Sequence, residues 1–186
     1  MEKKINVLRD SFTTGITRDI NWRKKQLNGL LKFLKDLEPE ITVALKKDLN
    51  KCNFEAVGID LLSSISEIHY VLKNLDSWIK PIYTESPFYT VPSTSEVNLE
   101  PLGVCLVIGA YNYPVTLVLG PLIGAISAGN CAVIKPSELS VEIEKLFCEN
   151  LHRYLDPNCF LTVAGGVSVN TDLLNNYKWD MIFFTG

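Results

Sequence analysis

Hydrophobic side chains in the first eighty residues recur at spacings of three and four, which is typical of helices that bury one face. The segment Asp19–Leu37 has one such stripe, formed by Trp22, Gln26, Leu27, Leu30, Leu31, Leu34 and Leu37. A second helix is expected from Pro39, a residue that suits a first helical turn, with inward Ile41, Ala44, Leu45 and Leu49. A third helix is expected at Phe54–Lys80, with the inward residues Leu61, Leu62, Ile65, Ile68, Leu72, Leu75 and Trp78. Residues 1–80 are therefore predicted to be helical.

The pattern changes between Pro81 and Glu100. Prolines at positions 81, 87 and 92 are interleaved with aromatic and β-branched residues, and proline in a helix interior removes a hydrogen bond and clashes with the preceding turn. We expect residues 81–100 to form an extended crossing segment that could serve as an edge strand.

Short apolar runs then alternate with amphipathic segments. Strands are expected at Gly103–Ile108, Cys131–Ile134, Phe160–Ala164 and Met181–Phe184. Helices are expected between them at Pro114–Ala128, with Gly129 as C-cap, at Ser140–Tyr154, with Ser140 as N-cap, and at Val169–Asn176. This order predicts βαβ units, an α/β fold with a parallel sheet and right-handed crossovers. The chain reaches position 186 directly after the fourth strand, so we expect residues 101–186 to be an incomplete, truncated nucleotide-binding core.

Composition and charge exclude several classes of protein. Hydrophobic residues make up 47% and charged residues 21%, values typical of a soluble globular chain. The formal net charge is −3, and the basic residues before Pro81 are interleaved with acids, so no nucleic-acid-binding surface is indicated. The two histidines show no metal-ligand spacing. Five cysteines without a pairing pattern, and no apolar leader after the first lysines, indicate a reducing, cytoplasmic setting.

One stretch admits a second interpretation. Residues 101–134 carry no charge, a length that could span a bilayer. Pro114 and Pro121 interrupt it, Asn112 lies inside it, and a buried parallel strand followed by a packed helix has the same composition. We favour the buried α/β interpretation, with a membrane hairpin as the alternative.

Ligands of such sheets bind beyond the carboxyl ends of the strands. The residues expected there are GAYNYP after Ile108, KPSE after Ile134, GG after Ala164 and TG after Phe184. The GxGxxG fingerprint of ordinary Rossmann dehydrogenases is absent. From these residues alone, Asn112 could be a turn residue before Tyr113-Pro114, and KPSE a solvated turn.

The segment Glu100–Ser140, with EPLGV, NYP after the first strand, a glycine-rich helix that ends at Gly129-Asn130, and KPSE, resembles the aldehyde dehydrogenase superfamily, particularly its class 3 branch. TRDINWRKKQL, ALKKDLNKCNFEA and FFTG extend the resemblance over nearly the whole chain. It implies the N-terminal part of an NAD- or NADP-dependent enzyme that oxidises aldehydes to carboxylates through a cysteine thioester. The nucleophilic cysteine, the general-base glutamate and the catalytic domain would lie beyond position 186.

The resemblance also assigns roles to single residues. Asn112 matches the asparagine that stabilises the oxyanion, a task for which a fixed amide donor is suited. Lys135 and Glu138 match residues that hold the adenosine ribose, and Gly186 matches the first glycine of a phosphate-facing loop. Tyr111 replaces a common tryptophan and keeps an aromatic wall.

Other properties follow from the same resemblance. It implies a homodimer for the full-length protein, and membrane attachment only through a C-terminal tail outside this chain. The alternative is a short non-catalytic product that binds nucleotide or interferes with dimers. Cys105 and Cys131 fall in predicted strands and are interpreted as small core residues rather than nucleophiles.

Overall fold

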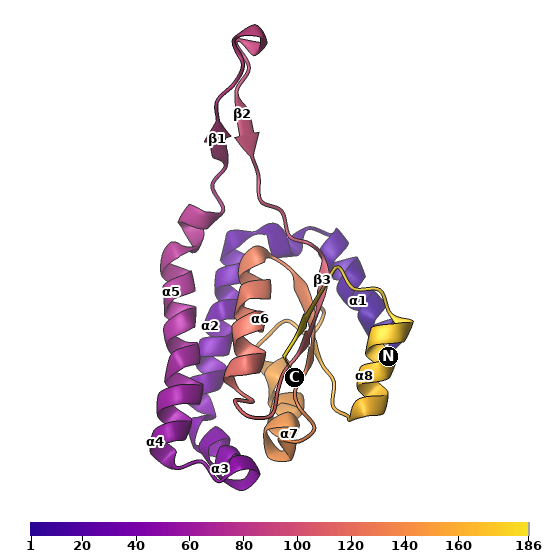
Figure 1. Ribbon diagram of the computed structural model, residues 1–186. Helices are drawn as coiled ribbons and strands as arrows, with labels where there is room; N and C mark the ends of the chain where they lie inside the picture. Colours follow the sequence, from indigo (N-terminus) through magenta and orange to yellow (C-terminus); the bar gives the residue numbers. More distant parts are fainter. Residues whose placement is uncertain (186) are drawn as a thin grey trace.

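The computed structural model describes residues 1–185, and Gly186 lies outside the described residues. A four-stranded parallel sheet carries helices on both faces, and a two-stranded hairpin projects from one end (Figure 1). The N-terminal helices are α1 (Glu2–Thr13), α2 (Ile20–Asp36), α3 (Glu38–Leu49), α4 (Asn53–Glu55) and α5 (Leu62–Trp78). A π-helical segment, Ala56–Leu61, joins α4 to α5.

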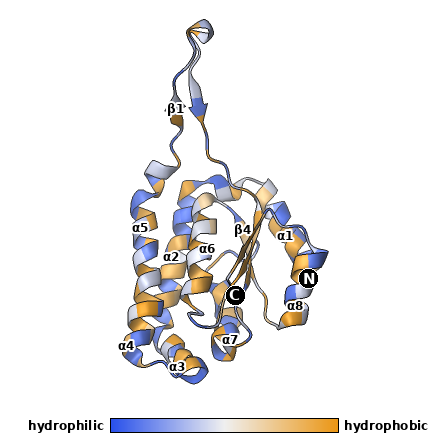
Figure 2. Ribbon diagram, in the orientation of Figure 1, coloured by the Kyte–Doolittle hydropathy of each residue, from blue (hydrophilic) through white to orange (hydrophobic). Residues whose placement is uncertain are grey.

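Helix α2 shows how the local sequence sets the fold. Its N-cap, Asp19, accepts a hydrogen bond from the Asn21 amide at 3.0 Å, as short polar side chains do at helix starts. Most of the apolar stripe predicted for this helix is buried, with Leu27, Leu30 and Leu34 fully inaccessible, whereas Leu31 and Leu37 are partly buried. In Figure 2, hydrophobic and hydrophilic stretches follow one another along α2, as expected of a helix with one buried face.

Two inward positions predicted for the third helix are wrong. Leu62 is 51% exposed and Trp78 is 42% exposed. Leu62 lies one residue, or about 100°, from the buried stripe that passes through Leu61 and Ile68. Trp78 lies at the helix end, where it packs on Tyr70 with ring centroids 5.7 Å apart.

Residues 81–100 form a hairpin instead of the expected crossing segment. Strands β1 (Ile82–Thr84) and β2 (Ser95–Val97) pair antiparallel, with Tyr83 opposite Glu96. The prolines fall outside both strands, where their missing N–H groups cost no ladder bond. The chain therefore doubles back on itself and projects from the body of the molecule (Figure 1).

The remaining elements confirm the predicted α/β fold. They are β3 (Val104–Ile108), α6 (Thr116–Ala128), β4 (Cys131–Lys135), α7 (Val141–Asn150), β5 (Phe160–Thr162), α8 (Val167–Asn176) and β6 (Met181–Phe184). The strand order is β5-β4-β3-β6, and every neighbouring pair is parallel. Gly129 ends α6 in the left-handed conformation, with φ of 85°, as predicted.

The charge-free stretch is divided between β3, α6 and the start of β4. All five residues of β3 and of β4 are buried, because helices cover both faces of these central strands (Figure 1). Among residues 1–185, no helix is long and apolar enough to cross a membrane.

Candidate functional site

A cleft of about 530 Å³ opens beyond the carboxyl ends of β3, β4 and β6. The strand register places Ile108 beside both Lys135 and Phe184, so the loops that follow these strands meet at one edge of the sheet. The polar lining residues are Tyr111, Asn112, Ser137, Glu138, Asn170 and Thr185. The structure thus brings Asn112 and Glu138 together, as predicted for this edge, whereas the predicted Gly186 lies outside the described residues.

Asn112 lies in the loop 109–115, which is held at several points. The Gly109 amide donates to the Lys135 carbonyl at 3.0 Å and so extends the ladder between β3 and β4. The Ser140 hydroxyl donates to the Tyr111 carbonyl at 2.9 Å. Asn112 itself is exposed and lines the cleft, so a restrained loop carries it at the cavity wall.

Ser140 occupies the predicted N-cap position of α7. Its hydroxyl donates to the Tyr111 carbonyl, however, and does not cap the helix. The amides of Glu142 and Ile143 instead donate to the two carboxylate oxygens of Asp48, each at 3.0 Å. Asp48 lies on α3, 94 residues before Glu142, and no local signal in the sequence identifies this long-range cap.

Lys135 lies behind the cleft and is completely buried. Its ammonium donates to Glu138 at 3.3 Å, to Glu144 at 3.2 Å and to the Pro136 carbonyl. Glu144 also accepts from the Gly165 amide at 2.9 Å, which ties the loop after β5 to the same cluster. Of the two predicted ribose ligands, Glu138 faces the cleft with its side chain 32% exposed, and Lys135 holds it from behind.

Sequence reasoning missed Asn170. It lies in the first half of α8 and lines the cleft. Within the described part of the chain, its Oδ1 atom is buried without a hydrogen-bond partner. Buried polar atoms are usually paired, so this oxygen is an unpaired polar atom within the wall of the cleft.

The strand cysteines are confirmed as core residues. Cys105 and Cys131 are fully buried in β3 and β4. Burial raises the pKa of Cys105 to about 11, and a hydrogen bond with Cys159, together with burial, raises the pKa of Cys131. The nucleophile in thiol chemistry is the thiolate, so neither residue is suited to attack a substrate at neutral pH.

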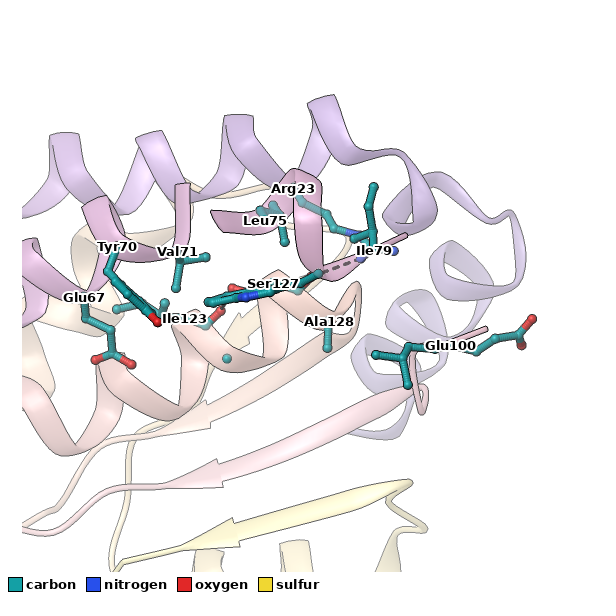
Figure 3. A pocket seen from close by; sticks show the side chains of 13 residues that line it. Arg23, Glu67, Tyr70, Val71, Leu75, Ile79, Glu100, Ile123, Ser127 and Ala128 are labelled. Carbon is teal, nitrogen blue, oxygen red and sulfur yellow. Dashed lines mark hydrogen bonds between the residues drawn. The ribbon is translucent and has the colours of Figure 1, made fainter. Parts of the chain in front are cut away.

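A second cavity, of about 450 Å³, lies between α5 and α6 (Figure 3). Its lining is mainly hydrocarbon, including Val71 and Ile123, and Glu67 contributes a carboxyl group. Burial raises the pKa of Glu67. This cavity is lined by helices rather than by the loops at the carboxyl ends of the strands, so the candidate site is the cleft around Asn112 and Glu138.

Comparison with known protein families matches residues 3–186 to the aldehyde dehydrogenase family. Aldehyde dehydrogenase family 3 member B1 of Mus musculus is 43% identical over 185 residues, which are 100% of this chain and 39% of that protein. Aldehyde dehydrogenase family 3 comG of Dictyostelium discoideum is 44% identical over 180 residues, 96% of this chain and 38% of that protein. The chain therefore spans about 39% of the length of such relatives.

Solved structures agree with this assignment. A substrate-bound state of AldH from Staphylococcus aureus matches with a TM-score of 0.93 and 37% identity, over 98% of this chain and 40% of that one. The glyceraldehyde-3-phosphate dehydrogenase GapN from Methanocaldococcus jannaschii, complexed with NADP, matches with a TM-score of 0.80 over 98% of this chain and 40% of that one. Its identity is 21%, so this second likeness concerns the fold alone.

Proposed function

Because this chain belongs to the aldehyde dehydrogenase family, we propose that the protein containing it oxidises aldehydes to carboxylates with NAD or NADP, through a cysteine thioester. The observation that carries the proposal is the cleft at the carboxyl edge of the sheet, where Asn112 and Glu138 line one cavity. In this proposal the nucleophilic cysteine and the general-base glutamate belong to the part of the family sequence beyond position 186.

The polar groups of the cleft fit a dinucleotide. Parallel α/β sheets bind nucleotides at this edge, and a carboxylate near the end of a strand can accept hydrogen bonds from ribose hydroxyls. Glu138 supplies that carboxylate, and Lys135 fixes it from behind. When bound, NAD or NADP supplies the hydride acceptor for the oxidation.

Asn112 is proposed to stabilise negative charge on the carbonyl oxygen of the substrate. An amide NH₂ group held before the reaction begins can donate to that oxygen without reorganising. The hydrogen bonds from Gly109 and Ser140 restrain its loop, which supplies this preorganisation.

The test is Asn112→Ala in the longer protein. We expect kcat to fall roughly a hundred- to a thousand-fold, with the Michaelis constant for the cofactor nearly unchanged. Asn28→Ala, at an exposed residue of α2, is the matched control and should leave both constants unchanged. An unaltered kcat in Asn112→Ala would make Asn112 a turn residue only.

A further inference from the structure

A buried ion pair lies beside the Asn112 loop and is not explained by the proposed chemistry. The Lys51 ammonium and the Asp60 carboxylate are 2.6 Å apart, and their side chains are only 6% and 0% exposed. Removing two charges from water is costly, and an apolar pair of the same volume is often as stable. The fold alone therefore gives little reason for a charged pair at this place.

The pair contacts the loop through an aromatic ring. The Lys51 ammonium lies 4.1 Å from the centroid of the Tyr113 ring, and Tyr113 is the residue directly after Asn112. A cation over the face of an aromatic ring is attracted by the ring quadrupole, most strongly where water is excluded. The position of Tyr113, and with it the direction of the neighbouring peptide, is thus coupled to Lys51.

The backbone of Asp60 also contacts the start of α6, directly after the loop. Its carbonyl oxygen accepts hydrogen bonds from the Thr116 hydroxyl at 3.2 Å and from the Ser64 hydroxyl at 2.9 Å. Thr116 is the first residue of α6, which begins where the loop ends. Asp60 lies within the π-helical segment Ala56–Leu61, and such segments are frequent at functional sites.

We infer that Lys51 and Asp60 are positioning residues, which hold Tyr113 and the start of α6 so that the Asn112 amide points into the cleft. The carboxylate fixes the ammonium, the ammonium fixes the ring, and the Asp60 carbonyl fixes Thr116. For its catalytic consequence this inference rests on the proposed function of Asn112. The mechanical part, restraint of loop 109–115, can be measured without any catalysis.

The first experiment replaces both charges and retains the packing. In the double variant Lys51→Met/Asp60→Leu, we expect amide hydrogen exchange within residues 109–117 to become about tenfold faster, because the contact between cation and ring is lost. Exchange in β3, β4 and α7 should stay unchanged. The matched control, Lys24→Met/Asp76→Leu, removes a pair of similar length, 2.7 Å, whose side chains are 31% and 62% exposed, and should leave the loop unaffected.

A second pair of variants acts on the ring and applies even if the double variant does not fold. Tyr113→Leu removes the aromatic face and should accelerate exchange in the same residues about tenfold. Tyr113→Phe keeps that face and should exchange like the unaltered protein. Unchanged loop exchange in the folded double variant, or acceleration shared equally by the whole sheet, would overturn the inference, and so would faster exchange in Tyr113→Phe.

Kinetics of the longer protein separate this inference from the proposed function. The double variant should lower kcat about tenfold and leave the cofactor Michaelis constant unchanged, since Glu138, the proposed ribose ligand, lies in the loop after β4 and outside the segment that the pair contacts. If Asn112→Ala leaves kcat unaltered, the proposed role of Asn112 fails, whereas the exchange measurements still decide whether Lys51 and Asp60 restrain the loop.

Discussion

Two buried lysines flank the candidate site, and their carboxylate partners differ. Lys51 has one partner, Asp60, which is completely buried. Lys135 has two, and one of them, Glu138, reaches the cleft with a third of its side chain exposed. The first pair is closed to solvent and to ligands, while the second cluster keeps an acceptor available. The two clusters therefore differ in the exposure of the partner rather than in the burial of the lysine, and the open cluster has a carboxylate that a ligand can reach.

The two clusters act on the same loop from different elements. Lys51 reaches Tyr113 through its side chain, and Lys135 receives the Gly109 amide through its backbone carbonyl. The loop is thereby held on both sides of Asn112, by the closed pair at Tyr113 and by β4 at Gly109.

The largest effect is expected for breaking the closed pair from one side. Asp60→Leu leaves the Lys51 ammonium buried without a counter-charge, which should lower the free energy of unfolding by about 3–5 kcal/mol. Urea denaturation of Asp60→Leu, Lys51→Met and the double variant forms a thermodynamic cycle. The double variant should recover most of the loss. A loss below about 1 kcal/mol in Asp60→Leu would mean that solvent reaches the pair.

An intermediate effect is expected from the open cluster, and in binding rather than in folding. Glu138→Ala in the longer protein should raise the Michaelis constant for NAD roughly tenfold, since a hydrogen bond to a charged group contributes about 1.5–3 kcal/mol. Binding that is equal in ground and transition states leaves kcat unchanged. NADP carries an additional phosphate that the carboxylate repels, so its constant should rise less. If the Michaelis constants for both cofactors rise equally, or if neither changes, Glu138 is a solvated turn residue and not a ribose ligand.

A smaller effect is expected at the surface pair between Lys24 and Asp76. Its length, 2.7 Å, is close to that of the buried pair, but both side chains contact solvent. Exposed pairs contribute about 0.2–1 kcal/mol, so Lys24→Met should change the free energy of unfolding by no more than that. Urea denaturation at low and high salt measures it, and a loss comparable with that of Asp60→Leu would contradict the role assigned to burial.

Much of the fold could be predicted because its signals are local. The apolar runs of β3, β4 and β6 and the C-cap Gly129 each depend on neighbouring residues. The hairpin could not be predicted, because two extended segments separated by a loop can either pair with each other or run across the body of the molecule. Which of these occurs depends on tertiary contacts rather than on the local sequence. The exposure of Leu62, the first residue of α5, was missed because the π-helical segment directly before it interrupts the regular periodicity.

The candidate site was predictable in its cleft-facing parts only. Asn112 and Glu138 directly follow the ends of strands, and parallel topology then places them at one edge. The capping of α7 by Asp48 and the contact of Lys51 with Tyr113 join residues far apart in the chain. No periodicity or spacing encodes such contacts, so they needed the three-dimensional structure.

The smallest effect is expected for Glu67, a partly buried carboxyl group that forms no ion pair with a lysine among residues 1–185. Its contribution to stability should change with pH in the direction opposite to that of a paired carboxylate. Burial raises the pKa of Glu67, so the folded protein binds its proton more tightly than the unfolded chain does. Stability from this group is therefore fully present below the unfolded pKa and is lost as pH rises through the folded one. Glu67→Gln should flatten this decline in the free energy of unfolding, measured by urea denaturation between about pH 4 and pH 7, with His69→Gln, at an exposed residue of the same helix, as control. Glu67 keeps solvent contact, which limits the change, and a steeper decline in Glu67→Gln than in the unaltered protein would show that its carboxylate is stabilised rather than penalised in the cavity.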